Sequence, residues 1–159
     1  MNLKPPSLQP SAIMQRAIAL AQAGVSQSGC KAELPIAAIL LNAEGEVLAQ
    51  AHNGVEAAQN PLAHAEMLAL AQALKTRRYL EDCTLAVTLE PCAMCMAALC
   101  HARVGKVIFG AYDPKSGGTV SGARVPQHMH FKPQILGGIE EDACRTLLQS
   151  FFQTLRNPA

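Results

Sequence analysis

The sequence predicts an α/β fold in which helices cover a mixed β-sheet of about five strands. Short apolar runs typical of strands alternate along the chain with segments of helical periodicity, which is the order of a layered α/β domain. The chain has 159 residues, close to the commonest size of a domain, and 50% of them are hydrophobic. Neither a repeat nor an internal linker interrupts this order. We therefore expect one domain over residues 1–159, with an irregular lead-in over residues 1–10.

Strands are expected where apolar runs lie between turn residues. Pro35 precedes a buried run over 36–41, and Glu44-Gly45 predicts the turn of a hairpin whose second strand spans 46–51. Further strands are expected at 84–89, 106–110 and 134–136.

Helices are expected where apolar residues recur every three or four positions. Ser11 can cap the first helix and Gly24 can end it, which leaves 25–33 as a polar loop. The segment 113–122 is rich in Gly, Pro and Ser and predicts a second long loop. The other helices are expected over about 63–74, 91–101 and 140–156.

Composition restricts the classes of function. The formal net charge is +1, which is typical neither of a nucleic-acid-binding protein nor of a chain with an acidic tail. The sequence shows no signal peptide and no membrane span, so we expect a cytoplasmic protein with no membrane contact. The chain holds six cysteines. In the cytoplasm a Cys-x-x-Cys pair more often binds metal or performs redox chemistry than forms a structural disulfide.

Two short motifs supply three candidate metal ligands: His64 in one, Cys92 and Cys95 in the other. The cysteines are three residues apart at the start of a predicted helix, so both sulfurs project from one face of its first turn. The unpaired N–H groups of a helix start favour thiolates, and Pro91 suits the first helical position. Two thiolates and one imidazole leave the fourth position of a zinc ion open, which is typical of a catalytic site.

Glu66 is the candidate acid–base residue. It lies two residues after His64, which turns it away from the ligands while keeping it on the same helical turn. From there it can reach a zinc-activated water without ligating the metal, take its proton and pass it to the substrate. These residues predict hydrolytic deamination, in which water adds to an amidine-like carbon and ammonia leaves.

A structural or redox role for the cysteine pair is the alternative. A structural zinc site needs a fourth ligand, for which Cys100 and His101 are the nearby candidates. Cys100 is eight residues from Cys92, about 12 Å along a helix, whereas ligands lie about 2.3 Å from one zinc. His101 is further away still and nearly on the opposite face.

The two motifs match the H-x-E…P-C-x-x-C signature of the cytidine/nucleobase deaminase superfamily. The runs NPLAHAEMLAL, TLAVTLEPCAMC and ARVGKVIFGAYDPKSGG resemble more closely the bacterial tRNA adenosine deaminases of the wobble-editing kind. This resemblance covers roughly residues 11–156. It implies a three-layer α/β/α cytidine-deaminase-like fold, a homodimer, one Zn²⁺ per subunit, and conversion of adenosine to inosine in a tRNA anticodon loop.

The resemblance also assigns roles to single residues. The three candidate ligands fall on its metal positions and Glu66 falls on its proton-shuttle position. Asn53 falls on the position that hydrogen-bonds the bound nucleoside, and Asp113 falls in the loop that borders the substrate entrance. Without the resemblance, Asn53 is an ordinary turn residue before Gly54, and Asp113 is a helix or turn cap before Pro114.

The substrate is left open between tRNA and a free base or nucleoside such as guanine, cytosine or adenine. Residues 101–135 carry five Lys or Arg residues against Asp113 as the one acidic residue, a local charge of +4 that could attract an RNA loop. Phe131, Phe151 and Phe152 could stack unpaired bases, although the last two could equally pack the final helix on the sheet. The low net charge and the weakly basic C-terminal segment favour the free base. A non-catalytic zinc module is disfavoured because Glu66 is present.

Overall fold

The structure is a computed structural model that describes residues 9–27 and 33–157. Each of the five predicted strands is present, with its ends within one residue of the prediction. In chain order the elements are α1 (Pro10–Gln27), β1 (Ala37–Leu41), β2 (Val47–His52), α2 (Val55–Ala58), α3 (Ala65–Ala73), β3 (Thr84–Leu89), α4 (Ala93–His101), β4 (Lys106–Ala111), the short 3-10 helix η1 (Val125–His128), β5 (Gln134–Leu136) and α5 (Glu141–Arg156).

The sheet is mixed and has the strand order β2-β1-β3-β4-β5. β1 is antiparallel to both of its neighbours, whereas β3, β4 and β5 run parallel to one another. A parallel pair needs a crossover connection, which α4 supplies between β3 and β4. All five residues of β1 are buried, as expected for an uninterrupted apolar run inside a sheet.

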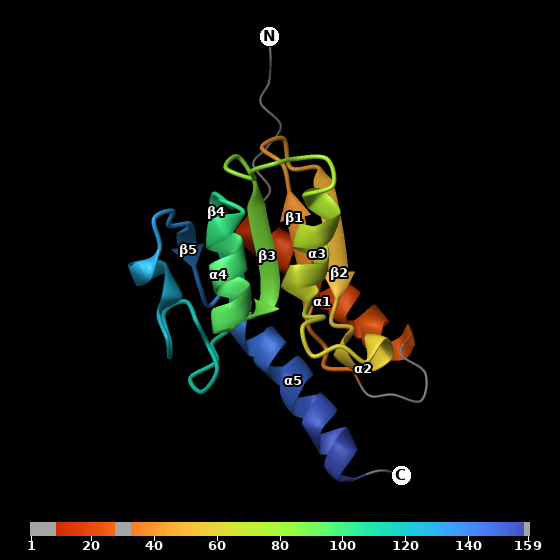
Figure 1. Ribbon diagram of the computed structural model, residues 1–159. Helices are drawn as coiled ribbons and strands as arrows, with labels where there is room; N and C mark the ends of the chain where they lie inside the picture. Colours follow the sequence, from red (N-terminus) through yellow and green to blue (C-terminus); the bar gives the residue numbers. More distant parts are fainter. Residues whose placement is uncertain (1–8, 28–32, 158–159) are drawn as a thin grey trace.

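Two hydrophobic cores lie on opposite faces of the sheet. Because successive strand residues point to opposite faces, neighbours in sequence enter different cores. The core under α3 and α4 contains the strand residues Leu40, Leu85, Val87, Val107 and Phe109. The core under α1 and α5 contains Ile39, Leu41, Ala86 and Ile108. Figure 1 shows α3 and α4 on the near face of the sheet and α1 on the far face. The three-layer α/β/α prediction is confirmed.

The first helix is longer than predicted. It begins at Pro10, so Ser11 lies inside it rather than at its cap, and it continues beyond Gly24 to Gln27. The prediction that Gly24 ends the helix was wrong, because this glycine serves close packing. A Cβ atom there would lie 2.5 Å from Cγ of His52 at the end of β2.

Two short helices interrupt segments that the sequence predicted to be irregular or did not assign. α2 lies between β2 and α3, and η1 lies between β4 and β5. Each has four residues, too few to show helical periodicity in sequence. No helix within the described ranges is both long and apolar enough to cross a membrane.

The last helix packs on the sheet only through its first half. Cys144 is buried and Leu148 contacts the far-face core, whereas Phe152 and Leu155 are 46% and 50% exposed. Figure 1 shows the second half of α5 extending beyond the sheet. Phe151 and Phe152 contact each other edge to face, with ring centroids 5.6 Å apart, and neither belongs to a core. They do not pack the helix on the sheet.

Candidate functional site

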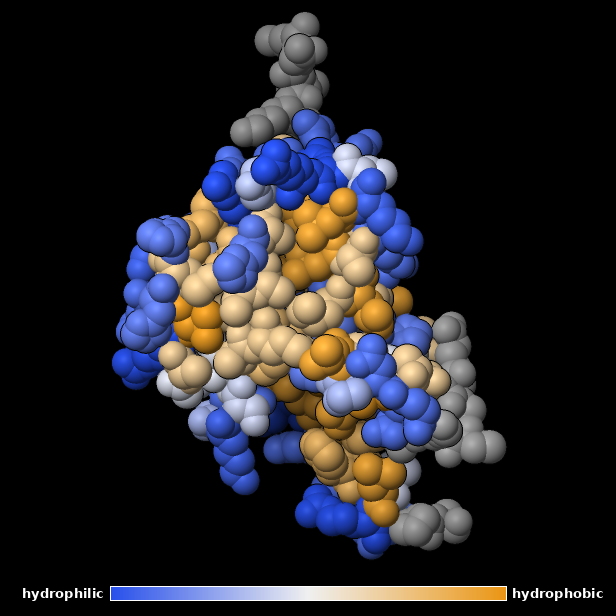
Figure 2. Space-filling view, viewed as in Figure 1, coloured by the Kyte–Doolittle hydropathy of each residue, from blue (hydrophilic) through white to orange (hydrophobic). Residues whose placement is uncertain are grey.

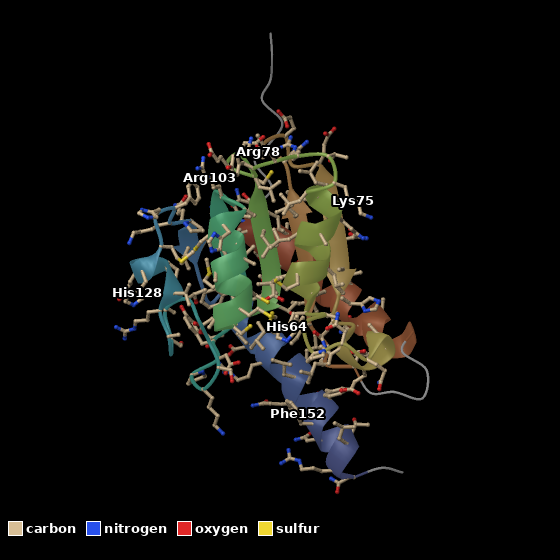
Figure 3. All side chains as sticks on the ribbon, viewed as in Figure 1. His64, Lys75, Arg78, Arg103, His128 and Phe152 are labelled. Atoms are coloured by element: carbon tan, nitrogen blue, oxygen red, sulfur yellow. The ribbon has the colours of Figure 1, made fainter. Side chains whose placement is uncertain are left out.

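The structure brings His64, Cys92 and Cys95 together where two helices begin. Figure 3 shows the position of His64. Nδ1 of His64 lies 3.6 Å from Sγ of Cys92 and 3.5 Å from Sγ of Cys95. Tetrahedral zinc, with bonds of about 2.3 Å to sulfur and about 2.0–2.1 Å to nitrogen, separates such atoms by about 3.6 Å. The three donors therefore fit zinc in both chemistry and spacing. Among the described residues no fourth His, Cys, Asp or Glu joins this group.

The local backbone explains how the three side chains meet. His64 is the N-cap of α3 and Cys92 is the N-cap of α4, each with an extended conformation. The expectation that Pro91 opens the helix was wrong by two residues. The carbonyl oxygen of Pro91 accepts a hydrogen bond from N of Gly118 at 2.7 Å, so the chain stays extended and the helix begins at Ala93.

The two thiols differ strongly in acidity. A hydrogen bond from the Cys95 thiol lowers the pKa of Cys92 to about 5, and the same bond, together with burial, raises the pKa of Cys95 far above its usual range. In the absence of metal the pair therefore shares one proton. Because a metal binds thiolates, zinc binding releases that proton.

Glu66 lies in the first turn of α3 and is only 4% exposed. Burial raises the pKa of its carboxyl group, because the charged form loses solvation. A buried carboxyl group with a raised pKa is suited to both accepting and donating a proton.

His64, Cys92 and Glu66 open onto a cavity of about 370 Å³, whereas Cys95 is fully buried behind them. Leu34, Ile36, Val55 and Leu89 give it apolar walls. It lies where the parallel strands β3 and β4 end, the usual place for a binding site in an α/β sheet. Its volume falls within the range of small-molecule sites and suits one nucleobase.

Both predicted substrate contacts, Asn53 and Asp113, line this cavity. Asn53 directly follows β2 and is 5% exposed. Asp113 follows β4, and its Oδ1 accepts hydrogen bonds from N of Lys115 at 3.3 Å and N of Ser116 at 3.0 Å. Asp113 thus caps a turn and also faces the cavity. His52 is not among the lining residues and ends β2.

Glu33 is a buried residue of the site that the sequence did not reveal. It is 1% exposed, and its Oε2 accepts a hydrogen bond from Nδ2 of Asn53 at 3.2 Å. Its Oε1 accepts a second from N of Ala57 in α2 at 2.6 Å. One acidic residue before a buried strand has no distinguishing pattern in sequence, because its partners are 20 and 24 residues away.

Glu90 is the second buried carboxylate that the sequence did not reveal. It is 2% exposed and accepts hydrogen bonds from Oγ1 of Thr119 at 2.7 Å and from N of Asp113 at 3.1 Å and Ser121 at 3.0 Å. Burial raises its pKa, but these bonds outweigh burial and the pKa is lowered. The position of Glu90 between a buried strand and the Pro-Cys motif was the one feature of the sequence that could have identified it. The carboxylate fixes the loop that carries Asp113.

The basic residues of 101–135 do not form one patch around the cavity. Arg103 pairs with Glu81 at 3.2 Å and stacks on Tyr79, 4.1 Å from the ring centroid. Figure 3 shows Arg103 near Arg78, at the end of the molecule opposite His64. Of the five basic residues, only Lys115 lies in the turn that Asp113 caps.

Comparison with known proteins defines the class of this fold and site. Residues 9–111 match the family model of the cytidine and deoxycytidylate deaminase zinc-binding region. The chain belongs to this family of zinc-dependent deaminases, and Zn²⁺ is its cofactor.

Two curated relatives and one solved structure are similar over most of the chain. The tRNA-specific adenosine deaminase of Bacillus subtilis is 44% identical over 131 residues, 79% of this chain and 80% of the relative. That of Aquifex aeolicus is 46% identical over 132 residues, 80% of this chain and 85% of the relative. A structure from a study of A-to-I editing by tRNA:A34 deaminases has a TM-score of 0.78 and 32% identity, with 85% of this chain and 97% of that chain covered.

A more distant structure shares the fold. The guanine deaminase of Nitrosomonas europaea superposes with a TM-score of 0.76 at 22% identity, over 91% of this chain and 85% of that chain. At this identity the likeness concerns the fold alone.

Proposed function

We propose that this protein is a zinc-dependent hydrolytic deaminase that converts adenosine to inosine at the wobble position of tRNA. The observation that carries the chemistry is the N,S,S cluster of His64, Cys92 and Cys95 beside the buried Glu66, at the wall of a base-sized cavity. The substrate is proposed because the relatives at 44% and 46% identity are tRNA-specific adenosine deaminases.

In this proposal His64, Cys92 and Cys95 hold one zinc per subunit. When bound, zinc acts as a Lewis acid that lowers the pKa of water and makes it nucleophilic near neutral pH. Glu66 accepts a proton from the attacking water and delivers it to the ring nitrogen. It then takes the second proton from the new hydroxyl group and gives it to the leaving amine. A C–O bond forms at C6 and the C–N bond breaks, so adenosine and water become inosine and ammonia.

Asn53 and Asp113 are proposed to position the substrate. Asn53 lies in the cavity wall and offers a polar contact to the base or its ribose. Asp113 also lines the cavity, in the loop that Glu90 holds. Their roles differ from those of the ligands, since their loss is expected to weaken substrate binding and leave zinc in place.

A free base or nucleoside remains the second candidate substrate. One observation favours it: the basic residues of 101–135 are not gathered around the cavity, and Arg103 is paired at the far end of the molecule. A neutral small substrate needs no such charge.

The proposed assembly is a cytoplasmic homodimer of one-domain subunits over residues 1–159. Figure 2 shows a continuous apolar surface over α3 and α4, which is larger than single exposed apolar residues would produce. The exposed or half-buried apolar residues of these helices and the residue after α3 are Met67, Leu68, Ala71, Leu74, Ala93, Met94, Ala97 and Ala98. The cytoplasmic location is proposed because relatives modify tRNA.

Inosine formation in an anticodon stem-loop with adenosine at the wobble position tests the proposal. Zinc-loaded protein is compared with the Glu66→Ala variant at equal zinc content. Conversion that depends on Glu66 supports the proposal. If fully zinc-loaded protein converts no stem-loop, the tRNA substrate is wrong. Ammonia release from adenine, guanine, cytosine and their nucleosides then identifies the small substrate.

A further inference from the structure

Glu33 connects two parts of the cavity wall through one buried carboxylate. One oxygen accepts a hydrogen bond from the side chain of Asn53, and the other accepts one from the backbone of Ala57 in α2. Glu33 and Asn53 both line the cavity that His64 and Glu66 share. Both are buried, at 1% and 5% exposure, so water does not readily replace either bond.

The carboxylate decides which way the amide of Asn53 points. The oxygen and nitrogen ends of an amide have nearly the same shape, so packing alone does not distinguish them. A carboxylate only accepts hydrogen bonds, so the nitrogen end of Asn53 must face Glu33. The carbonyl end then remains for the cavity, and no described residue donates a hydrogen bond to Oδ1 of Asn53.

We propose that Glu33 is a positioning residue that fixes the Asn53 amide, so that the cavity presents a carbonyl oxygen to an N–H or O–H donor of the substrate. This inference rests on the proposed function of Asn53 as a substrate contact. It defines the polarity of that contact: the substrate group that meets Asn53 is a donor, such as an amino group or a ribose hydroxyl.

Glutamine cannot replace Glu33 in this arrangement. The side chain faces two donors, Nδ2 of Asn53 and N of Ala57, and a carboxylate offers an acceptor to each. The amide of glutamine offers one acceptor and one donor group. In Glu33→Gln, either the bond to Ala57 is lost or the Asn53 amide turns over and directs its N–H groups into the cavity.

The test is an exchange of the two functional groups. In the double variant Glu33→Gln/Asn53→Asp, the glutamine N–H donates to the aspartate and its oxygen still accepts from Ala57. The second aspartate oxygen faces the cavity as an acceptor, and the pair still carries a single negative charge. Either single change leaves mismatched groups: two donors in Glu33→Gln and two carboxylates in Asn53→Asp.

The four proteins are compared by kcat/KM for inosine formation, thermal midpoint and zinc content. Glu33→Gln is expected to lower kcat/KM by about 10–100-fold, the effect of a lost hydrogen bond to a charged group, and Asn53→Asp by at least as much. The double variant is expected to return to within about fivefold of the parent, because the pair is coupled. Its thermal midpoint is expected to recover as well.

A matched exchange elsewhere controls for the chemistry of the substitutions. Nδ2 of Asn42 donates to Oε2 of Glu46 at 2.9 Å in the exposed β1–β2 turn. Glu46→Gln/Asn42→Asp makes the same two substitutions there and is expected to leave kcat/KM unchanged.

The inference is overturned if the double variant is no better than Glu33→Gln in kcat/KM, since Glu33 then acts only as a structural tie to α2. It is also overturned if the thermal midpoint shows no recovery, a result that needs no substrate. Failure of the proposed function is a separate result: the parent protein forms no inosine. In that case the same exchange is scored on the base that releases ammonia, with the same criterion.

Discussion

The side chain of Glu66 lies where burial disfavours its charged form and favours its protonated form. It is buried beside two sulfurs and an imidazole, and burial raises its pKa. The buried carboxylates of Glu33 and Glu90 hold other segments of the chain through hydrogen bonds, whereas that of Glu66 lies beside the candidate metal ligands. The residue is therefore better explained by proton transfer than by stability.

Glu66→Gln separates proton transfer from metal binding. The amide keeps the size of the side chain but cannot accept and return the proton, so we expect kcat to fall by about 10²–10⁴-fold. Zinc content, measured by atomic emission, is expected to stay at the parent value. A variant with activity within about threefold of the parent would show that another group moves the proton.

Cys92→Ser tests the ligand assignment. The hydroxyl is a far weaker zinc ligand than a thiolate, and metal binding is coupled to folding. We expect zinc content and thermal midpoint to fall together, with about 2–4 °C lost for each kcal/mol in a chain of this size. Cys100→Ser, a buried position in the same helix, is the matched control and should keep its zinc. Normal zinc in Cys92→Ser would refute the assignment.

At the scale of elements, one carboxylate organises the loop between β4 and η1. Glu90 accepts bonds from the backbone of Asp113, Val120 and Ser121, all in a segment without regular structure. The backbone of Gly117 passes close to this carboxylate, since a Cβ at Gly117 would lie 2.5 Å from Oε2 of Glu90. Asp113 near one end of the loop and residues 119–121 toward the other are therefore tied to one buried carboxylate.

Glu90→Gln is expected to release this loop. The amide N–H group of glutamine would face the backbone N–H groups of the loop. The loss of hydrogen bonds to a charged group is expected to lower the free energy of unfolding by about 2–3 kcal/mol. Hydrogen exchange at residues 119–121 should accelerate, and KM should rise while zinc content stays unchanged. Thr119→Val removes a single bond to Glu90 and is expected to have a smaller effect of about 1 kcal/mol. Unchanged exchange in Glu90→Gln would contradict the role.

Gly24→Ala is expected to destabilise the protein, although replacing a glycine in a helix by alanine usually stabilises it. In an open helix Gly→Ala stabilises by about 1 kcal/mol. Here the new methyl group would lie 2.5 Å from Cγ and 2.7 Å from Cβ of His52, so we expect destabilisation by about 1–3 kcal/mol in thermal or urea unfolding. His52→Ala should relieve the clash, so that Gly24→Ala becomes neutral or stabilising in that background. If Gly24→Ala alone stabilises the protein, His52 at the end of β2 can move away from the new methyl group at little cost.

These elements also show what the sequence could and could not predict. β3 and β5 were placed at their observed residues because their apolar runs end at turn residues. The three proposed ligands could be selected from the sequence because their residue types and spacing suit zinc, and the structure brings them together. Gly24 and Glu33 were misjudged or missed because their roles depend on His52 and Asn53, which the fold brings near from distant positions. The same holds for Glu90 and its loop.

For the whole molecule, the arrangement of layers decides which surface is free. The candidate site lies at the edge where β3 and β4 end, and the residues that line its cavity do not include those of the outer face of α3 and α4. That face is nonetheless apolar (Figure 2). Residues 94, 97 and 101 lie on one side of α4, away from the fully buried Met96 and Leu99. The proposed homodimer would bury this apolar helix face.

Ala97→Glu tests this contact in solution. Light scattering of the parent protein is expected to give twice the chain mass of 16.8 kDa, whereas a charge at Ala97 on the outer face of α4 should shift the mass toward the monomer. Ala19→Glu makes the same substitution at an exposed position of α1 on the opposite layer and should keep the dimer. If both variants and the parent share the monomer mass, the apolar face is not a homodimer interface. If Ala97→Glu alone is monomeric and keeps its zinc, the interface forms without contributing to the metal site.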